Sequence, residues 1–347
     1  MAYHVTVERD VRHPETGVVP GLDRLFEDPE VELSFLGPER GPALQPEDLA
    51  GADAYVSYSY DLTADSLAGV DSLELVTRAG AGYENLDLDA MTDHGVVAAH
   101  APQGPTASAA QATVAMVLAC AHNIPRQEHL LRTQGWEAAR EQGFELQNAT
   151  VGFVGMGLIG QKVLSNLAPF REDGLEATVY DPYLSPEGAG ELGLEQVDLD
   201  TLLDTSDVVT LHVPLTEETR GMLGTAEFER MQDSAYLVNT SRGGVYPDEE
   251  LAQALRQGEL AGAAVDVFED EPDVEGNPLL AVEETLLTPH AAGVTTDSLR
   301  RIHRIMAESI HAHKNGDPPR NVLNPTAYEQ LTGEQLPAER ETPSFRG

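Results

Sequence analysis

Short apolar runs alternate with longer stretches of helical periodicity over the first hundred residues. Runs such as Tyr3–Val7, Ala54–Ser57 and residues 73–77 have the length and composition of buried strands. Alternation of such strands with helices is typical of a parallel sheet covered by helices. We therefore predict an α/β domain that contains residues 1–102.

A second series of apolar runs follows the break in the pattern at residues 102–105. Residues 107–121 carry no charged side chain and predict a buried helix. Strands are expected in the run that begins at Thr150 and at residues 177–180, 208–212, 236–239, 262–265 and 285–288. A last helical pattern at 296–313 suits a return of the chain to the first domain.

The expected fold class is α/β, with two doubly wound parallel-sheet domains. A Rossmann domain at residues 103–291 would be inserted into a flavodoxin-like domain made of residues 1–102 and 292–325. Residues 326–347 are polar, and we expect them to form a loose tail.

A glycine motif lies in the run that begins at Thr150. Gly155, Gly157 and Gly160 complete the pattern G-x-G-x-x-G, which permits a tight turn, close approach of a pyrophosphate and close helix packing. Asp181 follows Gly160 by 21 residues, at the end of the next apolar run, where an acid can bond to ribose hydroxyls. The two signals together predict a dinucleotide-binding domain. Asp181 favours NAD, while NADP remains open because salt would screen the repulsion of its 2′-phosphate.

The charge of the chain is strongly negative. It has 59 acidic and 21 basic residues, a formal net charge of −38, and the acids are spread through core-forming sequence. We expect a halophile's cytoplasmic protein, whose charge is screened at multimolar salt, and neither nucleic acid nor an anionic membrane surface as a partner. No secretory leader is visible at the N-terminus, and residues 107–121 are too few for a membrane helix of about 20 residues.

Three polar side chains follow apolar runs of the second domain. Arg242 follows LVNTS, Glu271 follows AAVDVFED, and His290 follows LLTP. Ligands of open parallel sheets bind beyond the carboxyl ends of the strands, so we expect these side chains to converge. An arginine can bind a carboxylate, a histidine can exchange a proton with a carbonyl, and a carboxylate can raise the histidine pKa. The trio favours reversible reduction of a 2-oxo acid, although each residue alone also fits a structural role.

Over residues from about 50 to 324 the chain resembles the D-isomer specific 2-hydroxyacid dehydrogenase family, as a strongly acidic, haloarchaeal-type member. The motifs that carry the resemblance are RAGAGYENLD (78–87), VGFVGMGLIG (151–160), HVPLTEETRGML (212–223), LVNTSRGG (237–244), VDVFEDEP (265–272) and TPHAAG (288–293). The resemblance implies hydride transfer between a nicotinamide cofactor and a 2-oxo or 2-hydroxy acid. It makes Arg242, Glu271 and His290 the catalytic residues.

The resemblance also implies the binding residues. Those implied for the cofactor are Gly155, Gly157, Leu158, Ile159, Gly160, Asp181, Val213, Pro214, Thr240, Ser241, Arg242, Asp266, His290 and Gly293. Backbone N–H groups of Ala79, Gly80 and Ala81 would hold the substrate carboxylate opposite Arg242 and His290. Gln111 and Glu84 depart from the glutamate and aspartate usual in the family. A homodimer through helix 106–121 and the segment around Trp136 is expected.

The sequence leaves the substrate and two other functions open. Lactate-like, glyoxylate, hydroxypyruvate and branched 2-oxo acids all fit, whereas the longer phosphoglycerate dehydrogenases are disfavoured because no added regulatory domain is recognisable after Asn324. The alternatives are an NAD-sensing corepressor-like protein without enzymatic activity, and a formate or phosphite dehydrogenase of the same fold. No metal site is expected, because His303, His311 and His313 do not share one helix face.

Overall fold

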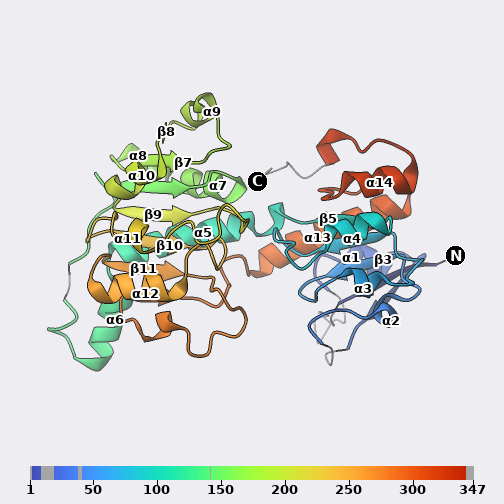
Figure 1. The fold of residues 1–347 in the computed structure, drawn as a ribbon, viewed down its shortest axis with the longest axis horizontal. Coiled ribbons are helices and arrows are strands. Elements are labelled where there is room, and N and C mark those ends of the chain that lie inside the picture. The colour runs from blue at the N-terminus through green and yellow to red at the C-terminus, as the bar shows by residue number, and fades with distance from the viewer. Residues whose placement is uncertain (1, 9–18, 38–40, 141, 341–347) are drawn as a thin grey trace. The chain divides into compact units, whose positions relative to one another are not determined.

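The computed structural model describes residues 2–8, 19–37, 41–140 and 142–340, and the chain divides into two compact units (Figure 1). The first, here called the split unit, contains the described residues up to Pro105 and those from Thr295 to 340. The second, the inserted unit, contains residues 106–294. The chain leaves the split unit within helix α5 (Gln103–Ala121) and returns to it immediately before α13 (Thr296–Lys314).

The split unit is built on a five-stranded parallel sheet of order β2-β1-β3-β4-β5. Its strands are β1 (Tyr3–Val7), β2 (Val31–Phe35), β3 (Ala54–Ser57), β4 (Leu75–Arg78) and β5 (Val97–His100). The order is that of a flavodoxin-like doubly wound sheet, as predicted. Its other elements are α1 (Asp23–Glu27), α2 (Pro46–Leu49), α3 (Ala64–Leu67), α4 (Leu88–Asp93), α13, α14 (Pro325–Thr332) and the 3₁₀ turn η2 (Ala338–Arg340).

Helices cover both faces of this sheet because successive strand residues point to opposite sides. In β3, Val56 packs in the cluster formed with α13, whereas its neighbour Tyr55 packs in the cluster on the other face. Ile302, Met306 and Ile310 recur every four residues and so give α13 one continuous apolar stripe.

The inserted unit contains a seven-stranded parallel sheet of order β12-β11-β10-β9-β6-β7-β8. Its strands are β6 (Thr150–Val154), β7 (Glu176–Tyr180), β8 (Glu195–Gln196), β9 (Val208–Leu211), β10 (Tyr236–Asn239), β11 (Gly262–Val265) and β12 (Thr285–Leu287). The strand order reverses between β6 and β9, which is the topological switch point where Rossmann domains bind dinucleotides. The predicted fold class, a Rossmann domain inserted into a flavodoxin-like domain, is confirmed.

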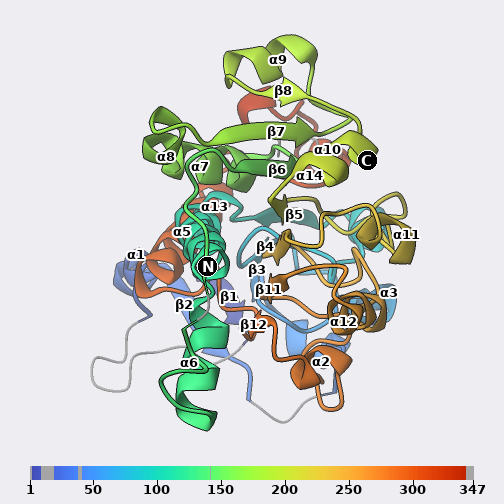
Figure 2. The same ribbon diagram turned by 90° about the vertical axis from the view of Figure 1, so that its left-hand side faces the viewer.

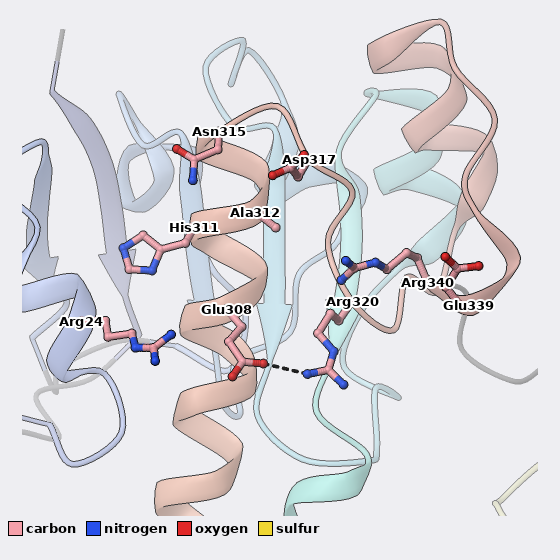
Figure 3. Close-up of a pocket in the computed structure, with 9 residues that line it drawn as sticks. All are labelled: Arg24, Glu308, His311, Ala312, Asn315, Asp317, Arg320, Glu339 and Arg340. Carbon is pink, nitrogen blue, oxygen red and sulfur yellow. Dashed lines mark hydrogen bonds and ion pairs between the residues drawn. The ribbon is translucent and has the colours of Figure 1, made fainter.

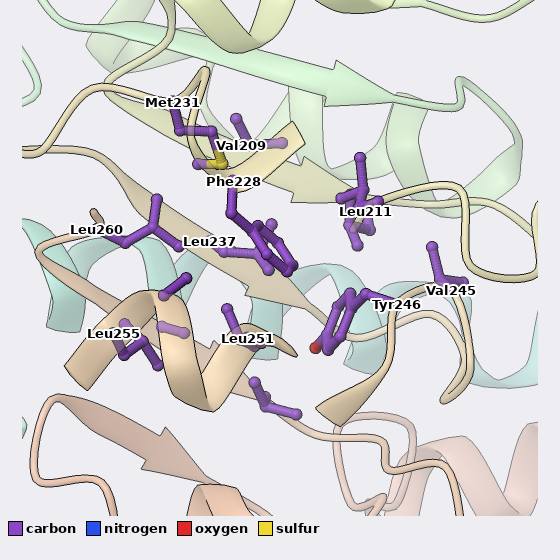
Figure 4. Close-up of a cluster of buried hydrophobic side chains, with 14 of the residues drawn as sticks. Val209, Leu211, Phe228, Met231, Leu237, Val245, Tyr246, Leu251, Leu255 and Leu260 are labelled. Carbon is purple, nitrogen blue, oxygen red and sulfur yellow. The ribbon is translucent and has the colours of Figure 1, made fainter. Parts of the chain in front are cut away.

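Helices flank the second sheet on both faces (Figure 2). They are α5, α6 (Ile124–Thr133), α7 (Leu158–Asn166), α8 (Ala168–Glu172), α9 (Pro186–Glu191), α10 (Leu199–Thr205), α11 (Thr225–Phe228) and α12 (Asp248–Gln257), with the 3₁₀ turn η1 (Pro278–Ala281). On one face, Phe228 and Leu251 pack on Val209 and Leu237 (Figure 4). The other face carries α5, whose Cys120 is buried.

The expectation that residues 326–347 form a loose tail is wrong for the described residues 326–340. Residues 325–332 form α14, and Ala327, Tyr328 and Leu336 lie in the core of the split unit. These apolar side chains are sparse, so the composition of the segment hid a packing role.

No single helix in the described ranges is long and apolar enough to cross a membrane. The pair α5 and α6 meets the length and composition test only when taken together, with a bend of 58° between them.

Candidate active site

The predicted glycine turn joins β6 to α7 at the switch point. Gly155 has φ +90°, and a Cβ at this position would lie 2.7 Å from the carbonyl oxygen of His212. A Cβ on Gly160 would lie 2.9 Å from the carbonyl oxygen of Gly155, so α7 packs closely on the turn. Gly157 is the extended N-cap residue, and Leu158 and Ile159 begin the helix. The turn is thus a cradle that side chains would fill, and it presents a helix N-terminus suited to phosphate.

Asp181 lies beside this turn, directly after β7. Its carboxylate accepts hydrogen bonds from the backbone N–H groups of Met156 and Tyr183, each at 2.8 Å. The Tyr183 hydroxyl in turn donates to Glu218 at 2.9 Å. The acid predicted to bind ribose is therefore held at the glycine turn by the turn itself.

His212 supports the turn from the end of β9, and sequence reasoning missed it. Its ring nitrogen lies 3.1 Å from the Thr210 hydroxyl, and burial lowers its pKa to about 3. The ring is therefore neutral and lies beside Gly160, while the His212 carbonyl lies beside Gly155. Val213 also contacts Gly155, and Pro214 follows. The sequence signal was its place at the end of an expected strand and at the start of the motif HVPLTEETRGML (212–223).

Asn239 fixes the loop that carries Arg242. Its side-chain oxygen accepts from both the N–H and the hydroxyl of Ser241, at 2.9 and 2.7 Å, and its amide donates to the Arg242 carbonyl. The Arg242 guanidinium donates to the Ser241 carbonyl at 2.7 Å. The Thr240 hydroxyl lies 2.8 Å from that of Thr113 in α5. Thr240, Ser241 and Arg242, the predicted site residues of this segment, therefore lie in one loop that hydrogen bonds hold rigid.

Asp266 anchors the loop that carries His290. This buried carboxylate accepts from the Thr288 hydroxyl and from the N–H groups of Ala291 and Ala292, at 2.5, 2.8 and 2.9 Å. The Asp266 carbonyl accepts from the His290 N–H at 2.7 Å. Asp266 was implied as a cofactor residue, and in the structure its carboxylate also positions residues 288–292, which Gly293 follows.

His290 and Glu271 form a hydrogen-bonded pair. The His290 Nδ1 atom lies 2.6 Å from a Glu271 carboxylate oxygen, and the other oxygen accepts from the Phe268 N–H at 2.8 Å. His290 has φ 48°, a left-handed backbone that few residues other than glycine adopt.

The pKa shifts of both residues favour their charged forms, an imidazolium at His290 and a carboxylate at Glu271. The Glu271 hydrogen bond raises the pKa of His290, against burial and the Arg242 charge, which lower it. Burial would raise the pKa of Glu271, but the hydrogen bonds from His290 and Phe268, with the charges of His290 and Arg242, lower it overall. Nε2 of His290 is left to exchange a proton.

The predicted substrate loop lies in the split unit, after β4. Gly80 has φ +95°, the Gly80 carbonyl accepts from the Ala101 N–H at 3.0 Å, and His100 Nδ1 lies 2.9 Å from the Ala81 carbonyl. The expectation for Ala79 is wrong, because its N–H donates to the Ser57 carbonyl at 2.9 Å. This leaves the N–H groups of Gly80 and Ala81 as candidates for the substrate carboxylate.

Comparison with known proteins places the chain in a family. Residues 114–292 match the model of "D-isomer specific 2-hydroxyacid dehydrogenase, NAD binding domain". The chain is 36% identical over 311 residues to a glyoxylate reductase of Korarchaeum cryptofilum, covering 88% of this chain and 92% of that protein. The chain belongs to the D-isomer specific 2-hydroxyacid dehydrogenase family.

Two further similarities show the range of this family. A D-3-phosphoglycerate dehydrogenase of Archaeoglobus fulgidus is 37% identical over 77% of this chain, but the match covers only 50% of that protein. This chain thus spans about half the length of the phosphoglycerate dehydrogenases that it matches. The crystal structure of an NAD-dependent formate dehydrogenase from Staphylococcus aureus in complex with NAD has a TM-score of 0.79 at 26% identity, over 92% of this chain and 98% of that one.

Proposed function

We propose that the chain is an NAD-dependent D-2-hydroxyacid dehydrogenase that reversibly reduces a 2-oxo acid to the D-2-hydroxy acid. The observation that carries the proposal is the His290–Glu271 pair at 2.6 Å, beside the Arg242 charge and beyond the ends of parallel strands. Reduction of a ketone requires a proton donor, and the raised pKa of His290 favours the protonated ring. Membership of the family supports the same chemistry.

The roles of the three residues follow from their chemistry. Nicotinamide, when bound, supplies or accepts the hydride at C2 of the substrate. His290 donates its Nε2 proton to the carbonyl oxygen in reduction and takes it back in oxidation. Arg242 holds the carboxylate and polarises the carbonyl. Glu271 orients the ring through Nδ1 and stabilises its charged form.

The residues around the glycine turn support NAD as the favoured cofactor. The Asp181 carboxylate suits a ribose with a free 2′-hydroxyl and repels a 2′-phosphate. Tyr183 lies two residues after Asp181 and donates its hydroxyl to Glu218. The Glu218 carboxylate therefore adds a second negative charge beside the turn. Salt screens this repulsion, so NADP is the alternative cofactor in multimolar salt.

The decisive experiment is oxidation of NADH and NADPH with a panel of 2-oxo acids in multimolar KCl. Turnover with any 2-oxo acid supports the proposal and ranks substrates and cofactors. His290→Gln should reduce turnover about 10²- to 10⁴-fold with little change in NADH affinity. Cofactor binding without turnover on any substrate would favour the sensing protein, and oxidation of formate or phosphite alone would favour the other dehydrogenase class.

We also propose a homodimer through the inserted unit. Ile124 and Leu131 of α6 and the neighbouring Trp136 are 54%, 50% and 69% exposed, which puts three exposed apolar side chains on one short segment. Sedimentation equilibrium in molar KCl should give about twice the chain mass of 37.3 kDa. A species of single-chain mass at micromolar concentration would contradict the dimer.

A further inference from the structure

A cavity of about 600 Å³ lies within the split unit, apart from every residue assigned to the reaction (Figure 3). Its walls come from α1, the last turns of α13, the loop that follows α13, and η2. The lining residues are Arg24, Glu308, His311, Ala312, Asn315, Asp317, Arg320, Glu339 and Arg340. A smaller hollow shares Arg24, Glu308 and Arg320 with it and adds Gln103, Arg301, Arg304 and Ile305.

The charge of these walls is opposite to that of the chain. Five arginines line the two hollows, against three carboxylates, in a protein with 21 basic and 59 acidic residues. Chance placement on so acidic a surface would give an excess of carboxylates. The excess of positive charge around these hollows therefore needs a physical explanation.

Ion pairs within the split unit account for only part of this charge. Glu308 lies 2.7 Å from Arg320 and 4.0 Å from Arg304, and Arg301 donates to the Gly104 carbonyl at 3.1 Å. No described residue forms an ion pair or side-chain hydrogen bond with Arg24 or Arg340. Figure 3 shows these two side chains on opposite walls, with the Glu308–Arg320 pair between them.

We propose that this cavity binds the phosphoryl group of a small metabolite. One guanidinium group binds two phosphate oxygens through parallel hydrogen bonds. A phosphate dianion can bind several arginines at once, whereas a single carboxylate would bind one. The volume lies within the range of small-molecule sites and exceeds what the phosphoryl group alone needs. Arg340 and Arg320, which Glu308 holds, bind the phosphoryl group, and Arg24 on the opposite wall binds another oxygen of the metabolite.

Binding would tie together segments that are far apart in the sequence. Arg24 belongs to α1, Arg340 to η2, and His311 and Ala312 of α13 form the wall between them. A ligand that binds only the folded unit stabilises it in proportion to the logarithm of ligand concentration over Kd. The inference does not depend on the proposed dehydrogenase activity.

The test is thermal unfolding of the full chain, titrated with inorganic phosphate or with ribose 5-phosphate against KCl of equal ionic strength. We expect a saturable rise in Tm beyond the KCl control, of about 3 °C at ten times the Kd. Tighter binding of the ester than of phosphate identifies a metabolite site as stated. Equal rises without saturation in phosphate, ester and KCl would overturn the proposal.

Substitutions of the lining arginines test whether the anion binds in this cavity. Arg24→Gln combined with Arg340→Gln should raise the Kd at least about tenfold, because each guanidinium supplies charge-assisted hydrogen bonds. Arg132→Gln is the matched control, since it removes an exposed arginine of α6 that pairs with Glu128, and its titration should equal that of the unchanged chain. Equal loss in both variants, or in neither, would contradict the site. If the double variant does not fold, isothermal titration of the unchanged chain decides, and absence of saturable heat overturns the proposal.

Discussion

At the scale of single residues, the proposed chemistry depends on the hydrogen bond between His290 and Glu271. Glu271 stabilises the charged form of His290, while Arg242, which suits the substrate carboxylate, opposes it. The proposed site therefore needs the glutamate to offset the charge of its own arginine. This balance makes the pH dependence of turnover a direct measure of the pair.

Glu271→Gln should move the pH profile to lower pH. The neutral amide no longer favours the imidazolium, so the raised pKa of His290 falls, and reduction, which needs the protonated ring, declines at a lower pH than before. Oxidation, which needs the neutral ring, should begin at a lower pH. Profiles of kcat/KM in both directions measure this shift.

Glu275→Gln is the control for that shift. Glu275 is exposed four residues further along the same loop, so its loss changes the net charge equally but leaves the bond to His290 intact. Identical profiles for Glu271→Gln, Glu275→Gln and the unchanged chain would remove Glu271 from the mechanism.

Gly155 is the residue on which the cofactor cradle depends. Gly155→Ala places a Cβ 2.7 Å from the His212 carbonyl at φ +90°, so we expect a loss of about 1–3 kcal/mol in unfolding free energy and weaker NADH binding. Chemical denaturation and NADH fluorescence in high salt measure the two effects. Gly190→Ala in α9, where no atom lies within 4 Å of the added Cβ, should leave both nearly unchanged or add slight stability. Equal effects of the two substitutions would refute the steric argument.

At the scale of elements, parallel strands bring the site together. Asn239 ends β10, Asp266 follows β11, and the loop of His290 follows β12, so three adjacent strands end at the same edge of one sheet. Asn239 fixes the loop that follows its own strand, whereas Asp266 fixes the loop that follows the neighbouring strand β12. Rigid strands therefore supply the positions, and the loops carry the proposed reacting groups.

Helix α14 should contribute measurably to the stability of the split unit. Tyr328 is 3% exposed in the core that α13 shares, so Tyr328→Ala should lower the unfolding free energy by about 3 kcal/mol. Gln330→Ala on the exposed side of the same helix is the control and should change it little. Denaturant unfolding in molar KCl measures both. If Tyr328→Ala were neutral, the segment would be the loose tail that its composition predicted.

At the scale of the whole chain, the net charge of −38 governs the response to salt. Self-repulsion among the carboxylates weakens as the screening length falls from about 10 Å at 0.1 M to about 3 Å at 1 M. We expect Tm to rise with KCl over this range, and the KM for an anionic 2-oxo acid to fall. Sucrose at equal osmolality is the control for excluded-volume effects. A Tm and KM indifferent to KCl would contradict the electrostatic argument.

Much of the fold and the candidate site was predictable because it rests on local signals. Strand residues such as those of β3 and β10 are buried on both faces, so they read as continuous apolar runs, and the glycine pattern marks a turn that only glycine permits. The predictions that failed concerned contacts between separate segments of the chain. The Ala79 N–H is bonded across the sheet to Ser57, and Tyr328 fills a core made by other segments, and neither fact has a periodicity of its own.

The sequence alone determined the fold class, the insertion of one domain into the other, the glycine turn and the residues that follow each strand. These depend on hydrophobic periodicity and on backbone conformations that few residue types permit. Only the tertiary structure decided that Asp266 anchors the His290 loop, that His212 supports the glycine turn, and that arginines from α1, η2 and the loop after α13 share one cavity. Such pairings join residues distant along the chain, and their geometry exists only once the strands and helices have packed.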